Sequence, residues 1–514
     1  MFIRKKKNKS GTTSIVVVDK HGKKFKELHT AGVAVDNDEI EKLCAQGREW
    51  INRHLGILEL DFEESDKKNK EFESASAMLD NIDSVLLNGA KLILDKVYDS
   101  IGFNKISDNV LRHLVIARLC QPMSKMATAD YLKNHFDEDV SLSKIYRYLD
   151  KLSDNQHEIV QGISVMHTSK ILDGHIGVLF YDVTTLYFEA DYEDDLRKTG
   201  FSKEGRHKNP QIIPGLLVSI GGYPLAYCIY EGNKYEGHTM LPVVTEFVRK
   251  YSLDDFIVVA DSGLMNGNNI ADLESNGYKY IIGAKIKNES KKIQEWILAQ
   301  PKVNCQMIEY DKGNGQRLLV GYTDDRARKD AYNREKGIRR LEKAYNRGTL
   351  TKDNINKRGY NKFLKMEGDV KVSINYDKLE ADEKWDGLKG YLTNTDIPVS
   401  EVYAAYHNLW HVERAFRISK SKIEIRPMFH FTRRRIEAHV CICFVALKVY
   451  KELERLLKLS NINMSVDKVL ALAQTIVTIQ VTLPQSKQTI TRTMLMKRHQ
   501  RIAPLFNDGF WGTH

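Results

Sequence analysis

Several features that mark other protein classes are missing from this chain of 514 residues. It has no run of about eighteen apolar residues, so we expect no membrane-spanning helix. The basic start MFIRKKKNKS is not followed by an apolar segment, which argues against a secretory signal. The six cysteines include no C-x-x-C pair, so neither a disulfide framework nor a structural zinc site is expected. These absences are consistent with a reducing, cytoplasmic setting.

Common catalytic signatures are missing too. The sequence has no G-x-S-x-G elbow and no P-loop, which counts against the usual α/β hydrolases and P-loop enzymes. Internal repeats and low-complexity tracts are also absent. What the chain does have is 42% hydrophobic and 28% charged residues, at a length that predicts about two to four domains with sizeable cores.

The charge of the chain is unbalanced towards the positive side, with a net charge of +10 and a pI of about 9.0. Such an excess indicates either a polyanionic partner or a merely basic surface. Between Arg326 and Lys365 there are 14 lysines and arginines but only 4 acidic residues. This segment is either a solvated charged helix or a contact with DNA.

The first 170 residues contain a basic arm and several predicted helices. The arm precedes a predicted hairpin around His21-Gly22 and a helix over 38–54. The charged stretch 61–76 is interpreted as a linker. Further along, two short helices with Ser124 and Ser141 as N-caps are typical of a helix-turn-helix.

In that interpretation Lys144, Tyr146 and Arg147 face DNA, whereas the alternative is an ordinary helical bundle.

From residue 177 to 284 the spacing of the apolar residues changes, and it indicates strands that alternate with helices. The predicted order is three strands, helix, strand, helix, strand, which indicates a mixed α/β sheet. Asp182 lies within the apolar strand LFYDVTTLYF, and Asp261 lies at the carboxyl end of the strand IVVADSG. A buried aspartate is either satisfied by backbone amides or binds a ligand, and open α/β sheets place their ligands at this edge.

A third carboxylate, Glu413, lies on a helix predicted to start near Val402. Tyr406, Glu413 and Lys420 are spaced by seven residues, or two helical turns, so they share one face with Arg417. The alternative is a solvated face with salt bridges. Three carboxylates that meet repel one another unless divalent cations lie between them. Two ions of Mg²⁺ or Mn²⁺ would suit such oxygen ligands and would serve phosphoryl transfer.

Four segments together resemble a known family, the bacterial insertion-sequence transposases of the DDE type. They lie between Val178 and Leu447 and are, in order, YDVTTLYF, GFSKEGRHKNPQIIPGLLVS with PLAYCIYEGN, VVADSGLMN, and YHNLWHVERAFRISKSKIEIRPMFHFTRRRIEAHVCICFVAL. The family's signature helix carries tyrosine, arginine, glutamate and lysine at offsets zero, three, seven and fourteen. Tyr406, Glu413 and Lys420 match this pattern, but offset three is Leu409.

The resemblance implies a ribonuclease-H-like mixed sheet flanked by helices. Asp182 and Asp261 are 79 residues apart (261 − 182), and Asp261 and Glu413 are 152 apart (413 − 261). The longer gap implies a strand-containing insertion domain. The expected organisation is a basic arm, hairpin and helix at 1–60, a helical DNA-binding region at 61–170, the two parts of the catalytic core at 171–289 and 401–460, the insertion domain at 290–400, and a helical tail at 461–514.

By resemblance, Asp182, Asp261 and Glu413 are catalytic and hold two metal ions. Lys144, Arg147, Tyr406, Arg417 and Lys420 are the expected DNA-binding residues. The expected reaction is cleavage at the element's terminal inverted repeats, followed by attack of the freed 3′-hydroxyl on target DNA, by a homodimer formed on DNA. The alternatives are a ribonuclease-H-like nuclease without strand transfer and a non-catalytic DNA-binding derivative.

Overall fold

The chain forms two compact units in this computed structural model. The structure describes residues 1–22, 24–56, 76–152, 156–190, 192–202, 205–206, 208–264, 267–351, 354–356, 359–367, 371–483, 486–507 and 511. One unit is Met1–Ser84 with Ile479–Thr491, and the other is Val85–Thr478 with Arg492–His514. The predicted linker at 61–76 lies almost wholly outside the described residues. None of the described helices is long and apolar enough to cross a membrane.

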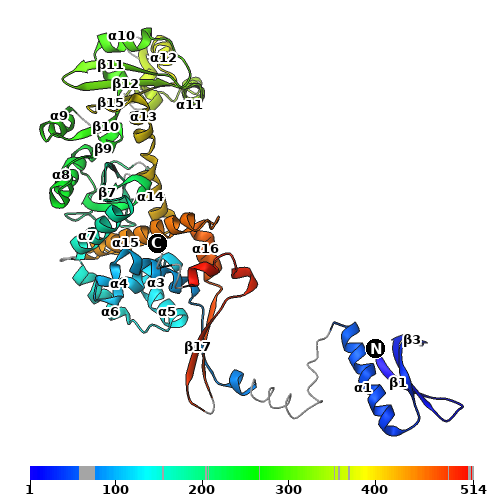
Figure 1. The fold of residues 1–514 in the computed structure, drawn as a ribbon. Helices are drawn as coiled ribbons and strands as arrows, with labels where there is room; N and C mark the ends of the chain where they lie inside the picture. Colours follow the sequence, from blue (N-terminus) through cyan, green and yellow to red (C-terminus); the bar gives the residue numbers. More distant parts are fainter. Residues whose placement is uncertain are drawn as a thin grey trace. The chain divides into compact units, whose positions relative to one another are not determined.

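The first unit begins with a three-stranded antiparallel sheet and a helix (Figure 1). Its strands, in the order β1-β2-β3, are β1 (Phe2–Lys7), β2 (Thr13–His21) and β3 (Lys24–Ala34), and α1 (Asn37–His54) follows. The predicted hairpin and the predicted helix are therefore confirmed. The basic arm forms the outer strand of this sheet.

The second unit begins with a group of helices. They pack around a long helix that comes much later in the chain. The helices are α3 (Gly89–Ile101), α4 (Asn109–Cys120), α5 (Lys125–Phe136), α6 (Leu142–Leu152) and α7 (Gln156–Ile171). Ser124 caps α5, because its hydroxyl accepts a hydrogen bond from the Ala127 amide, and Ser141 does the same for Lys144. Strand β4 (Ile82–Leu86) precedes these helices in a region that the sequence analysis expected to be helical.

A nine-stranded mixed sheet lies at the centre of the second unit. Its first part comprises β5 (Val178–Val183), β6 (Leu186–Tyr187), β7 (Gln211–Val218), β8 (Pro224–Glu231), β9 (Ile257–Ala260) and β10 (Lys279–Ala284). The strand order is β8-β7-β5-β9-β10, with β5, β9 and β10 parallel and β7 and β8 antiparallel. The predicted succession of strands and helices, with α8 (Met240–Tyr251) and α9 (Gly267–Ser275), is confirmed, as is the mixed sheet flanked by helices.

The inserted segment between β10 and the last helices extends this same sheet. It holds α10 (Lys291–Ala299), β11 (Met307–Gly313), β12 (Gln316–Tyr322), α11 (Asp324–Asn346), β13 (Leu364–Glu367), β14 (Lys371–Ile374), α12 (Tyr376–Glu383) and β15 (Leu388–Thr393). Strand β15 pairs antiparallel with β10, and β12 and β11 continue beyond it. Residues of this segment therefore lie directly beside β10, which in turn pairs with β9.

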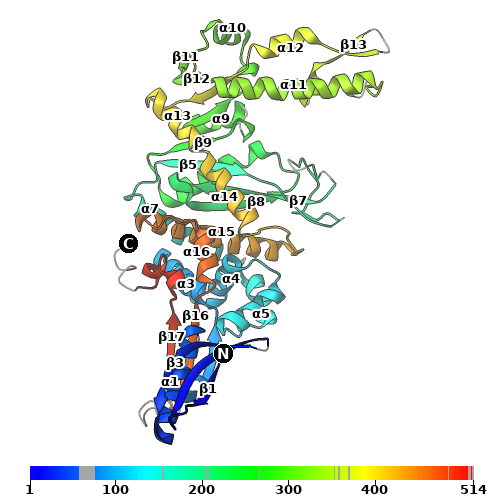
Figure 2. The ribbon, with the colours of Figure 1, turned by 90° about the vertical axis from the view of Figure 1, so that its right-hand side faces the viewer.

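The two faces of the sheet are covered by different helices, which Figures 1 and 2 show on opposite sides. On one face, α8 and α9 pack in a core with Tyr181 and Ala260. On the other face, Phe180 and Val259 share a core with α13 (Val399–His407), α14 (Trp410–Ser421) and α15 (Arg433–Leu459). The face of Phe180 and Val259 is thus the one towards α13 and α14.

Two expectations for the last hundred residues are wrong in detail. The single helix predicted from Val402 is divided into α13 and α14, because Asn408 and Leu409 form a tight turn in which the His411 amide bonds to the Asn408 carbonyl. The tail is not wholly helical. It contains α16 (Val466–Ala473), but β16 (Val477–Thr482) and β17 (Thr489–Met494) follow as strands rich in β-branched residues.

Candidate active site

Asp182 and Asp261 emerge at the same level from neighbouring parallel strands. Tyr181 of β5 lies opposite Ala260 of β9, so the next residue on each strand is one of the two aspartates. Side chains alternate along a strand, and both aspartates therefore fall on the face of Phe180 and Val259, towards α13 and α14. Asp182 is half-buried and Asp261 is exposed. This is the carboxyl edge at which open α/β sheets place their ligands.

Tyr406 forms a hydrogen bond with one of the two aspartates. Its hydroxyl donates a hydrogen bond of 3.1 Å to Oδ1 of Asp261. The ring is buried, and it can come this close because β10 has Gly283 at that point, where a Cβ would lie 2.6 Å from the hydroxyl oxygen. Burial and the neighbouring Asp261 charge raise the pKa of Tyr406, so the hydroxyl stays protonated and remains a donor.

Glu413 lies in the first turn of α14, exposed to solvent. Its charge and that of Asp261 both act on Tyr406 and on the ammonium group of Lys389. Tyr406 and Glu413 lie on separate helices, because the helix is broken between them. The seven-residue spacing therefore does not place Tyr406 and Glu413 on one continuous helical face, and their meeting at one site stays a prediction.

The donor chemistry of the three carboxylates suits a divalent ion, since Mg²⁺ and Mn²⁺ prefer hard oxygen ligands. Asp182 and Asp261 leave adjacent strands at one level, as two ligands of a shared ion would. Within the part of the chain that the structure describes, however, no three His, Cys, Asp or Glu side chains are gathered as the ligands of one ion. The metal-binding role of Asp182, Asp261 and Glu413 therefore stays a prediction.

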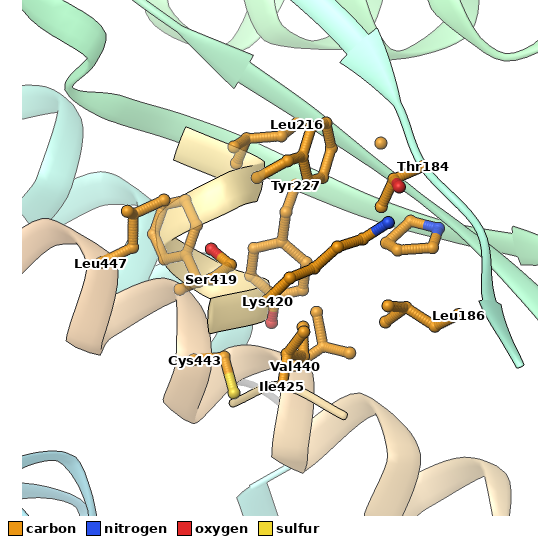
Figure 3. Close-up of a pocket in the computed structure, with 14 residues that line it drawn as sticks. Thr184, Leu186, Leu216, Tyr227, Ser419, Lys420, Ile425, Val440, Cys443 and Leu447 are labelled. Carbon is orange, nitrogen blue, oxygen red and sulfur yellow. The ribbon is translucent and has the colours of Figure 1, made fainter. Parts of the chain in front are cut away.

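The remaining predicted residues of α14 lie further along that helix. Arg417 is exposed, one turn beyond Glu413. Lys420 is half-buried and lies along a mainly apolar cavity of about 30 Å³, with its amino group directed towards Thr184 (Figure 3). A cavity of that volume has room for about one water molecule and does not admit a nucleotide. Contact of these two side chains with DNA remains a prediction.

The predicted helix-turn-helix residues lie on α6, which packs on α15. Lys144 and Arg147 are exposed on this helix. Tyr146 is half-buried beneath the guanidinium of Arg435, 4.7 Å from its ring centre, so it packs inside the unit. The contact of Lys144 and Arg147 with DNA stays a prediction.

One cation near the carboxylates, Lys389, was missed by the sequence analysis. Lys389 of β15 places its Nζ atom 4.4 Å from the ring centre of Tyr406. The charge of Arg326, in the first turn of α11, also acts on Lys389. The available signal was a lone lysine inside the apolar strand LKGYLT. The strand pairing that brings β15 beside β10 was not readable from sequence.

The chain is similar in sequence to one family of known proteins. The family model of the transposase DDE domain matches residues 174–448, which is more than half of the chain. Among solved structures, a cryo-EM structure of a piggyBac transposase synaptic complex with hairpin DNA is similar at 9% identity and a TM-score of 0.38, over 86% of this chain and 81% of that one. No curated protein has a detectable match to this sequence.

Proposed function

Because the chain belongs to the family of transposases with a DDE domain, we propose that it is the DNA transposase of an insertion sequence. Its reaction is hydrolysis of a phosphodiester at each end of its element, followed by attack of the freed 3′-hydroxyl on target DNA. One phosphodiester replaces another in the second step, so no external energy source is needed. The proposed site of action is the cytoplasm, and the proposed working form on DNA is a homodimer.

The observation that carries this proposal is the shared level of Asp182 and Asp261 at the carboxyl edge of β5 and β9, with Tyr406 bonded to Asp261. Exposed carboxylates at a sheet edge are accessible to a phosphodiester. Glu413 acts electrostatically at the same place from α14. Two neighbouring strands thus bring two acidic side chains to one edge of the sheet, and Glu413 of α14 is proposed to complete the site.

The proposed roles follow from these positions. Asp182, Asp261 and Glu413 would hold two divalent metal ions, which when bound activate the attacking oxygen and stabilise the leaving oxygen. Tyr406 orients the Asp261 carboxylate through its hydroxyl. Arg417 and Lys420 of α14, and Lys144 and Arg147 of α6, are proposed to bind DNA phosphates along the terminal inverted repeats and the target.

The test is a combined cleavage and strand-transfer assay. Purified protein is incubated with DNA carrying both gene-flanking ends and with a target plasmid, in Mg²⁺, Mn²⁺ or EDTA. Metal-dependent nicks at the ends together with joined products support the proposal. Cleavage without joining would identify a nuclease instead, and binding with neither would identify a non-catalytic DNA-binding protein.

A further inference from the structure

The family resemblance implies an arginine that contacts DNA phosphate three residues beyond Tyr406, and this chain has no cation there. The residue three beyond Tyr406 is Leu409, which is 6% exposed and belongs to the core. Arg414 does not take that place, because its guanidinium is hydrogen-bonded to Glu454 of α15 and lies 5.8 Å from the ring centre of Trp410. Arg417 is one turn further along α14. A cation beside Asp261 must therefore come from another element.

Strand β15 of the inserted segment supplies one. Lys389 lies on the same face of the sheet as Tyr391, two residues on, and Tyr391 packs edge-on against Tyr406 with ring centres 4.7 Å apart. The Nζ atom of Lys389 lies 4.4 Å from the centre of the Tyr406 ring and 5.6 Å from that of Tyr391. The same Tyr406 donates to Asp261, so one tyrosine contacts both the ammonium group and the carboxylate.

The ammonium group of Lys389 has hydrogen-bonding capacity to spare. An ammonium group carries three donors, and in the described part of the chain Lys389 makes no hydrogen bond or ion pair. Two aromatic rings hold the half-buried side chain without satisfying those donors. A cation held in this way is positioned to bind an incoming anion.

The surrounding charges identify the anion. A phosphodiester that approaches Asp261 and Glu413 brings a further negative charge to a place that already carries carboxylates. Lys389 and, beside it, Arg326 are cations whose charges act at this place. Arg326 is also paired with Asp330 at 3.7 Å, which leaves Lys389 with the greater donor capacity.

We propose that Lys389 binds the scissile phosphodiester at the carboxylates, and so takes the phosphate-binding role of the family arginine, in whose place this chain has Leu409. This inference rests on the proposed function, and it assigns the inserted segment a direct part in substrate binding. The insertion then contributes a binding residue to the reaction, beyond extending the sheet.

The experiment compares DNA affinities in a Glu413→Gln background, where binding is measured without cleavage. End DNA is prepared with either a normal scissile phosphodiester or an uncharged methylphosphonate at that one position. With Lys389 present, the methylphosphonate should weaken binding by about tenfold, since a charge-assisted contact is lost. With Lys389→Met the two DNAs should bind equally, and Lys389→Arg should restore part of the difference.

The matched control is Lys292→Met, which removes an exposed lysine of α10 and should leave the tenfold difference intact. The inference is overturned if Lys389→Met keeps the full difference. It is also overturned if the single variant Lys389→Met, with Glu413 intact, cleaves as fast as the parent protein. Failure of the proposed function looks different, because the unmodified protein would then not cut end DNA in any metal.

Discussion

Two charged regions of the second unit differ in how their charges are satisfied. At the sheet edge, Asp261 and Glu413 are exposed, and of the two only Asp261 has a described hydrogen bond, the one from Tyr406. In the middle of α15, by contrast, Glu452 is 1% exposed and Lys448 is fully buried. A carboxylate that stays in water loses no hydration free energy, whereas a buried charge destabilises the fold unless it is paired.

In the buried region both charged side chains have partners. The ammonium group of Lys448 donates to the Ser164 carbonyl at 3.1 Å and to the Thr168 hydroxyl. Glu452 accepts from Arg455 at 2.7 Å and lies 3.6 Å from Nε2 of His167. These partners all lie within the protein. Charges of this kind stabilise one arrangement of α7 and α15, while those at the sheet edge remain accessible to a ligand.

The largest expected effect is a loss of cleavage activity, and it distinguishes the sheet edge from the buried region of α15. Glu413→Gln should lower end cleavage by at least about 1000-fold, which corresponds to roughly 4 kcal/mol of lost transition-state stabilisation. Because Glu413 is exposed, the melting temperature of the Glu413→Gln variant should stay within about 2 °C of that of the parent protein. Gel-based cleavage and thermal denaturation measure the two quantities. Asp182→Asn and Asp261→Asn should behave alike, and cleavage retained in any of the three removes that residue from the site.

Glu452→Gln should show the opposite pattern. Loss of this carboxylate leaves Arg455 and His167 without their buried partner, and the free energy of unfolding should fall by about 3 kcal/mol. Urea denaturation at pH 7 measures it. Although burial raises the pKa of Glu452, its bonds to Arg455 and His167 lower it to about 2. Its stabilising contribution is therefore present above about pH 4.5 and is lost as the pH falls towards 2. An unchanged urea midpoint would contradict the pairing.

The next effect concerns the pH dependence of stability. Burial lowers the pKa of Lys448 to about 7, from an unfolded value of 10.5. Between these values the unfolded chain binds the proton more readily than the folded protein, so stability should rise with pH, by on the order of 1 kcal/mol per unit. Lys448→Met should abolish this rise, whereas the exposed Lys292→Met should retain it. Parallel pH profiles for the two variants would argue against a buried, titrating Lys448.

Tyr406→Phe should have the smallest effect. The change removes one hydrogen bond to Asp261 but keeps the buried ring. Because the Asp261 carboxylate is then held less firmly, the transition state should lose about 1 kcal/mol of stabilisation, and cleavage should slow by roughly fivefold. Single-turnover cleavage at saturating DNA measures the change, with the nearby Tyr403→Phe as the matched control. Equal rates for Tyr406→Phe and the parent would show that Asp261 needs no such support.

Periodicity and strand-end position were enough to predict the mixed sheet, the order of its strands and helices, and the two aspartates as ligand candidates. The same reasoning did not find the break between α13 and α14, because Tyr406, Leu409 and Glu413 read as a continuous helical pattern. It also missed the strands of the tail. A local sequence pattern reports only local conformational preferences. A tight turn at Asn408 does not disturb the helical spacing of the residues around it, so the pattern does not reveal the turn.

By itself, the sequence determined which residues alternate, which are apolar and which carboxylates follow strands, since these depend on neighbours along the chain. Only the tertiary structure decided that β15 pairs with β10, and hence that Lys389 of the insertion lies beside Tyr406. It alone decided that Glu452 is buried and Glu413 exposed, although both lie on charged helical segments. The physical reason is that strand pairing and burial are set by contacts between residues far apart in sequence, which no local pattern encodes.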